Sequence, residues 1–123
     1  MKRIAAALSA LSVATTASLP FSQAHAAALY FEKSVVKTSS EKTCLSFASD
    51  VANSQRFRNA HRSASEVAGE KDGAYVAITC VGRPNQQAVA VVMSTSESFE
   101  TAKAVGRAIA DRIKGIACFD TPC

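Results

Sequence analysis

Several segments of the chain have the pattern of apolar residues that is typical of β-strands. Residues 29–37 are rich in aromatic and β-branched side chains and predict a strand, whose imperfect alternation favours an edge position or a bulge. Residues 74–81 and 88–93 are almost continuously apolar and predict two central strands, joined by a polar turn at residues 83–86. Residues 64–68 fit either a short strand or a loop, and a turn is expected at residues 69–73, which contain the hairpin signal Asp72-Gly73.

Two further segments show the spacing of helices. The first follows the capping-box pattern Thr38-x-x-Glu41, and it is expected to end near residues 55–57. The second follows a similar pattern at Ser94-x-x-Glu97. The apolar stripes consist of Cys44, Phe47, Ala48 and Val51 in the first helix and of Ala102, Val105, Gly106, Ile109, Ile113 and Ile116 in the second.

The resulting order, β-α-(β)-β-β-α, predicts an α+β fold. We expect an antiparallel sheet of three to four strands with both helices packed on one face. The two central strands are apolar on both faces, so the face without helices requires a cover. We therefore predict a homodimer through the sheet face. On the first strand, Phe31 is expected in the core and Tyr30 half-exposed. The alternative is that both lie exposed on an edge strand that pairs with another copy or with a client peptide.

The N-terminal segment has the features of a cleaved secretory signal peptide. Lys2 and Arg3 precede an apolar run that is shorter than the roughly 20 residues needed to span a bilayer. Ala24-His25-Ala26 then fits the small-x-small cleavage pattern. We therefore predict that residues 1–26 are a signal peptide, that residues 27–123 form one small domain, and that the protein is periplasmic or secreted, without a membrane span. Cleavage after Ala28 is the alternative.

Removal of this segment lowers the net charge. The precursor has 14 Lys and Arg against 10 Asp and Glu residues, and two of the basic residues leave with the signal, so the net charge falls from +4 to about +2. Nucleic-acid binding calls for a clustered basic face, which this balance does not indicate. We expect no nucleic-acid partner, and we predict an envelope protein as a possible partner instead.

All four cysteines lie in the predicted mature domain, as is typical of a disulfide-stabilised exported protein. Four cysteines allow three connectivities, and the pairs Cys44–Cys80 and Cys118–Cys123 are favoured because they suit a bridge from helix to sheet and a closed tail. The sequence does not exclude the other two connectivities. Neither a CxxC pair nor a Cys/His cluster is present, so we predict no metal site and no cofactor.

The most basic stretch is the candidate for recognition chemistry. Arg56, Arg58, His61 and Arg62 are predicted to form a possible site for an anion or an acidic partner, through the donors of their side chains. Positive charges at a solvated helix end would give the same pattern. Because no nucleophile-elbow motif such as GxSxG occurs, the sequence favours a non-catalytic binding domain, such as an accessory or inhibitor protein. The alternative is a small secreted hydrolase that uses His61.

Overall fold

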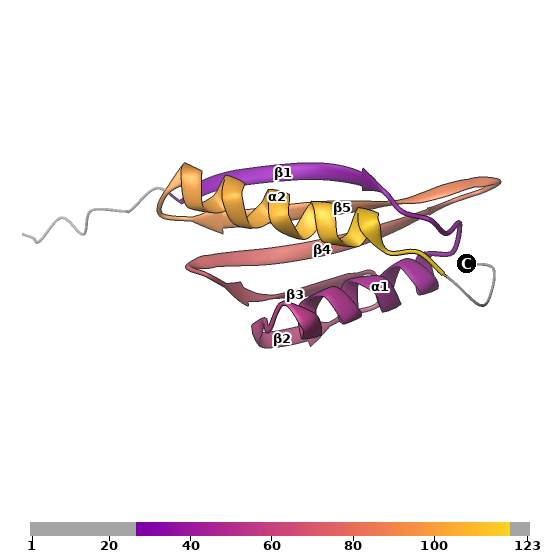
Figure 1. The fold of residues 1–123 in the computed structure, drawn as a ribbon, viewed down its shortest axis with the longest axis horizontal. Coiled ribbons are helices and arrows are strands. Elements are labelled where there is room, and N and C mark those ends of the chain that lie inside the picture. Colours follow the sequence, from indigo (N-terminus) through magenta and orange to yellow (C-terminus); the bar gives the residue numbers. More distant parts are fainter. Residues whose placement is uncertain (1–26, 119–123) are drawn as a thin grey trace, which may run out of the picture.

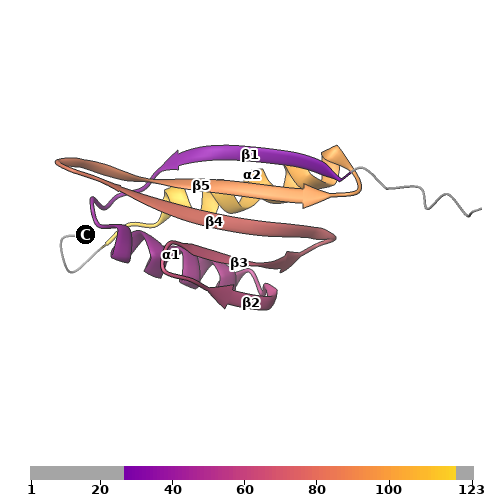
Figure 2. The same ribbon diagram turned by 180° about the vertical axis from the view of Figure 1, so that it is seen from behind.

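The computed structural model describes residues 27–118, which form a five-stranded antiparallel sheet with two helices on one face (Figures 1 and 2). The strands lie side by side in the order β1-β5-β4-β3-β2. The α+β class and the single helical layer are as predicted, but the expected number of three to four strands is wrong. The elements are β1 (Ala28–Val35), α1 (Glu41–Ser54), β2 (Arg58–Arg62), β3 (Glu66–Lys71), β4 (Ala74–Arg83), β5 (Gln86–Ser96) and α2 (Phe99–Gly115).

The additional strand, β2, forms the edge of the sheet beside β3. All five of its residues are exposed, and its sequence RNAHR has no apolar alternation that would reveal a strand. β3 begins near the short strand suggested by the sequence and continues to Lys71, through a segment that had been expected to turn. The turn itself is confined to Asp72 and Gly73, whose φ angles of 47° and 80° fit the left-handed conformation of a tight hairpin.

Both helices begin at residues other than those of the predicted capping boxes. Ser40 caps α1 by accepting a hydrogen bond from the Thr43 amide at 3.2 Å, whereas Thr38 lies upstream and accepts from the Ser40 amide. Ser98 caps α2 in the same way. Ser94, predicted to cap α2, is instead buried within β5. For each helix, both the predicted and the observed cap are serine or threonine. The capping motif alone therefore does not identify the residue at which the helix begins.

The core lies between the helical layer and the inward face of the sheet. α1 packs mainly against β3 and β4, and α2 packs against β1 and β5 (Figure 1). The fully buried centre includes Val76, Ile78 and Val92 from the sheet, with Ile109 and Ile113 from α2. Helices and sheet thus share one apolar layer, which leaves the opposite face of the sheet uncovered within the described residues (Figure 2).

One predicted disulfide links the two layers. Cys44 of α1 and Cys80 of β4 are bonded, and both side chains are buried. Cys118 is also oxidised, but its predicted partner, Cys123, lies outside the described residues, as does the predicted signal peptide. No helix within residues 27–118 is long and apolar enough to cross a membrane.

Candidate interaction surface

The sheet presents a second face, turned away from the helices, which we call the open face. Strand alternation and the antiparallel register assign its positions from four strands. They are Leu29, Phe31, Lys33 and Val35 of β1, Val89, Val91, Met93 and Thr95 of β5, Tyr75, Ala77, Thr79 and Val81 of β4, and Glu66, Ala68 and Glu70 of β3.

Large apolar side chains on the open face are in contact with solvent. Phe31 is 61% exposed, and Leu29, Val35 and Val81 are each about half exposed. The expectation that Phe31 belongs to the core is therefore wrong, because the residue points away from the helices. Single exposed apolar residues are ordinary, but a contiguous set of them on adjacent strands is typical of a surface that binds another molecule.

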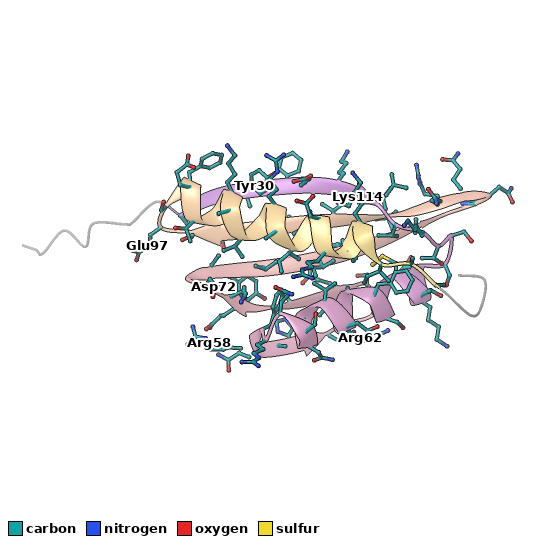
Figure 3. All side chains as sticks on the ribbon, viewed as in Figure 1. Tyr30, Arg58, Arg62, Asp72, Glu97 and Lys114 are labelled. Atoms are coloured by element: carbon teal, nitrogen blue, oxygen red, sulfur yellow. A yellow bond between two sulfur atoms is a disulfide. The ribbon has the colours of Figure 1, made fainter. Side chains whose placement is uncertain are left out.

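Tyr30, the neighbour of Phe31, points to the helical side of the sheet (Figure 3). Its ring packs edge-on against Phe99 of α2, with the ring centres 6.4 Å apart. Its hydroxyl donates a hydrogen bond of 2.6 Å to the Glu32 carboxylate, and this bond raises the pKa of Tyr30 above its usual value of 10.0. The half-exposed position expected for Tyr30 is confirmed.

The charged groups of the open face are few and lie at its two sides. On β3, Glu70 forms an ion pair of 3.1 Å with Arg58. Glu66 accepts a hydrogen bond of 3.1 Å from the Thr79 hydroxyl of β4. Lys33 lies on β1, at the other side of the apolar centre. Among the described residues, neither Lys33 nor Glu66 takes part in an ion pair.

The four residues predicted to bind an anion are dispersed. Arg58 is engaged by Glu70, and Arg62 turns to the helical side, where it donates a hydrogen bond of 3.3 Å to Ser49 of α1. Figure 3 shows the two arginines at separate places along β2. Arg56 lies in the connection after α1 and has a φ of 55°. Arg56, Arg58, His61 and Arg62 thus do not converge, and an anion site on them stays a prediction.

His61, the residue on which the hydrolase alternative depends, lies on the edge strand and is exposed. Its ring stacks near that of Tyr75, with centres 6.5 Å apart, and its Nδ1 atom lies 3.5 Å from the Asn59 carbonyl oxygen. Within residues 27–118, no hydrogen bond or ion pair joins this ring to a carboxylate or to a serine hydroxyl. A nucleophile activated by His61 would require such partners, so the geometry gives the hydrolase alternative no support.

A hollow lies on the helical side, where α2 passes the β3–β4 turn. It has a volume of about 570 Å³ and is wide open to solvent. The Lys71–Asp72 ion pair at its rim, 3.1 Å long, neutralises the two charges nearest the turn. In the part of the chain that is described, no three His, Cys, Asp or Glu residues are grouped so that they could hold a metal ion.

The outward face of the sheet is thus the feature that most requires a functional explanation. Sequence reasoning found it from the two-sided apolar pattern of β4 and β5, but it did not assign Leu29, Phe31 and Val35 to it. Comparison with known proteins adds no assignment, since no protein-family model, curated protein or solved structure matches this chain.

Proposed function

We propose that this protein is an exported interaction domain that binds another protein surface through the open face of its sheet. The exposure of large apolar side chains on three adjacent strands carries this proposal. Leu29, Phe31 and Val35 extend along β1, and Val81 and Met93 continue the surface across β4 and β5. Burial of apolar area contributes about 25 cal/mol per Å², so covering such a face stabilises a complex.

The redox state supports the exported part of this proposal. Cys44 and Cys80 form a buried cross-link between helix and sheet, and none of the described cysteines is free. Structural disulfides persist in oxidising compartments and are rare in the cytosol. A domain of this size has a modest core, and a covalent link between its layers compensates for that. Export to the periplasm or the cell exterior would provide the conditions in which this link forms.

Site-specific photo-crosslinking in the producing cell tests the interaction. A photoreactive phenylalanine analogue is placed at Phe31, and a matched variant carries it at Phe99, an aromatic residue of similar exposure on α2. We expect a discrete crosslinked product from the Phe31 position and little or none from the Phe99 position. A third variant, with the analogue at Phe31 and Val81→Asp added, is expected to lose the product because a buried, unpaired carboxylate is costly.

Two results would contradict the proposal. Absence of crosslinks at Phe31 would show that the open face contacts no protein in the cell. Equal products at Phe31 and Phe99 would show that contact is unspecific. The disulfide-bonded state of each variant, measured by thiol labelling, confirms that the comparison is made between folded proteins.

A further inference from the structure

Four residues form one straight row across the open face. Lys33 of β1 is the partner of Val91 of β5, Val91 pairs with Thr79 of β4, and Thr79 pairs with Glu66 of β3. The row therefore begins with a positive charge, passes over two uncharged residues and ends with a negative charge. Adjacent strands lie about 4.8 Å apart, so Lys33 and Glu66 are separated by about 14 Å. This distance is too long for an ion pair within one chain.

The two charges nevertheless complement each other under a simple rotation. From this symmetry, and resting on the proposed function of the open face, we propose that the face binds a second copy of this chain. The two sheets pack face to face about a two-fold axis that runs parallel to the strands, above the line between β5 and β4. This rotation places β1 of one copy opposite β3 of the other. Lys33 of each copy then lies opposite Glu66 of its partner, which forms two equivalent ion pairs.

The spacing of packed sheets suits this contact. Facing sheets lie about 10 Å apart, a gap that lysine and glutamate side chains span when they extend toward each other. The strands of aligned packed sheets cross at about 30°. At Lys33 and Glu66, which lie about 7 Å from the axis, this crossing shifts the facing residues by roughly 4 Å relative to each other. The flexible Lys33 side chain can follow that displacement. Glu66 is held in place by the hydroxyl of Thr79 at 3.1 Å, so one partner of each pair is already oriented.

The same rotation matches the apolar positions by size. Met93 lies opposite the position of Ala77, a large side chain against a small one. Phe31 lies opposite Ala68, which is fully buried between the stacked rings of His61 and Tyr75, so the Phe31 ring would meet those rings. Contacts of a large side chain with a small one and of aromatic rings with each other are typical of packed sheets.

The other symmetric arrangement is less favourable. A two-fold axis perpendicular to the strands, above the row that contains Phe31, would place β3 opposite β3. Glu66 would then face Glu70 of the second copy, because these residues lie on the rows on either side of the axis. Like charges brought together in a desolvated contact are repulsive. Charge complementarity thus favours the axis parallel to the strands over this perpendicular axis.

The area of the open face indicates the strength of the dimer. Three strands with four outward positions each and a fourth strand with three cover about 20 Å by 27 Å, on the order of 500 Å² per copy. The total of about 1,000 Å² lies at the lower limit of specific protein interfaces. We therefore expect a reversible dimer with a dissociation constant in the micromolar range, on the order of 1–100 µM.

Sedimentation equilibrium of the purified, oxidised protein tests this dimer through a charge exchange. Lys33→Glu and Glu66→Lys are each expected to weaken dimerisation about 10-fold, since each variant places like charges opposite each other twice. The double variant Lys33→Glu/Glu66→Lys restores opposite charges and is expected to return within about 3-fold of the original dissociation constant. Lys42→Glu, a charge reversal at an exposed position of α1, is the matched control and leaves dimerisation unchanged.

Each other outcome overturns the proposal in a recognisable way. A dimer that neither single variant weakens points to another contact, such as pairing of β1 edges. Weakening in both single variants without recovery in the double variant shows that Lys33 and Glu66 do not face each other. A protein that remains monomeric to about 500 µM while Phe31 crosslinks to a different protein refutes the second copy and leaves the proposed function standing. Loss of both signals refutes both.

Discussion

Cys44, on the buried side of α1, is bonded to Cys80, near the end of β4, with their Cα atoms 5.9 Å apart. The bond closes a loop with a sequence separation of 36, which contains most of α1, all of β2 and β3, and most of β4. One helix is therefore fixed covalently to a central strand, whereas α2 packs against the sheet and accepts a hydrogen bond from Ser34 at the Ala110 carbonyl.

Replacement of both cysteines, Cys44→Ala/Cys80→Ala, should lower the free energy of unfolding by about 3–4 kcal/mol, as expected for closure of a loop of this length. The reason is that the unfolded chain gains the conformations that the cross-link forbids. Urea denaturation of the oxidised protein and the variant measures the difference. A loss below about 1 kcal/mol would show that α1 stays near β4 in the unfolded variant even without the cross-link.

Gly106 of α2 allows this helix to approach β1 and β5 closely. A Cβ atom at this position would lie 2.7 Å from Cδ1 of Tyr30 and 3.0 Å from Cβ of Ser94. Gly106→Ala should therefore destabilise the fold by about 1–3 kcal/mol, although alanine favours helices more than glycine does. Gly115→Ala is the matched control, because no atom lies within 4 Å of a Cβ there, and its stability should stay equal or rise slightly. Equal effects of the two substitutions in thermal unfolding would contradict this interpretation.

Ser94 is fully buried in β5, and its hydroxyl has no hydrogen-bond partner among the described residues. Ser94→Ala removes an unpaired polar group and is expected to raise the free energy of unfolding by about 1 kcal/mol. Ser34→Ala is the contrasting variant, because the Ser34 hydroxyl donates to the Ala110 carbonyl at 3.3 Å. It should lower stability. If both substitutions destabilise the protein in urea, the Ser94 hydroxyl contributes to folding through a contact other than a hydrogen bond.

Tyr30 should ionise at a higher pH than a free tyrosine. Its hydrogen bond to Glu32 raises the pKa above 10.0, so the phenol holds its proton more tightly in the folded than in the unfolded protein. The resulting contribution to stability is fully present below pH 10.0 and is lost as the pH rises through the folded pKa.

Phenolate absorbance in a Tyr75→Phe background reports on Tyr30 alone, since the chain has two tyrosines. Adding Glu32→Ala should return the midpoint toward 10.0, because it removes the acceptor and its negative charge. An unchanged midpoint would assign the shift to burial beside α2 instead.

The sequence predicted the layers of the fold better than it predicted the path of the chain. Residues 74–81 and 88–93 were recognisable as strands because both of their faces are apolar. β2 was missed because an exposed edge strand needs no apolar side chain to keep its hydrogen bonds, and Asn59, with a φ of 52°, interrupts its register. Its stability comes from pairing with β3, which local sequence does not encode.

The Cys44–Cys80 pairing was predicted correctly from an incomplete topology. If residues 64–68 were a loop, no strand would lie between α1 and β4 and Cys80 would lie near Cys44, whereas the structure has two intervening strands, β2 and β3. Two intervening antiparallel strands reverse the direction of the chain twice. β4 therefore keeps the orientation that places Cys80 beside the start of α1. A single additional strand would have moved Cys80 to the opposite end of the sheet.

The open face was anticipated from β4 and β5, but its most exposed residues come from β1. Alternation in residues 29–37 does not reveal which side of the strand faces the helices. That choice follows from the register with β5, in which Tyr30 pairs with the buried Ser94 and Phe31 with the exposed Met93. Such a pairing of distant segments is a tertiary property, so the surface could be assigned only from the structure.

The position of β1 also determines when the domain can be completed during synthesis. This strand is the first of the described elements, yet it pairs with β5 and packs against α2, the last two. A chain that emerges with its N-terminus first holds β1 without a partner until nearly all of the domain has followed. Long-range contacts of this kind slow folding. The topology thus delays completion of the sheet until nearly all of the described domain has been synthesised.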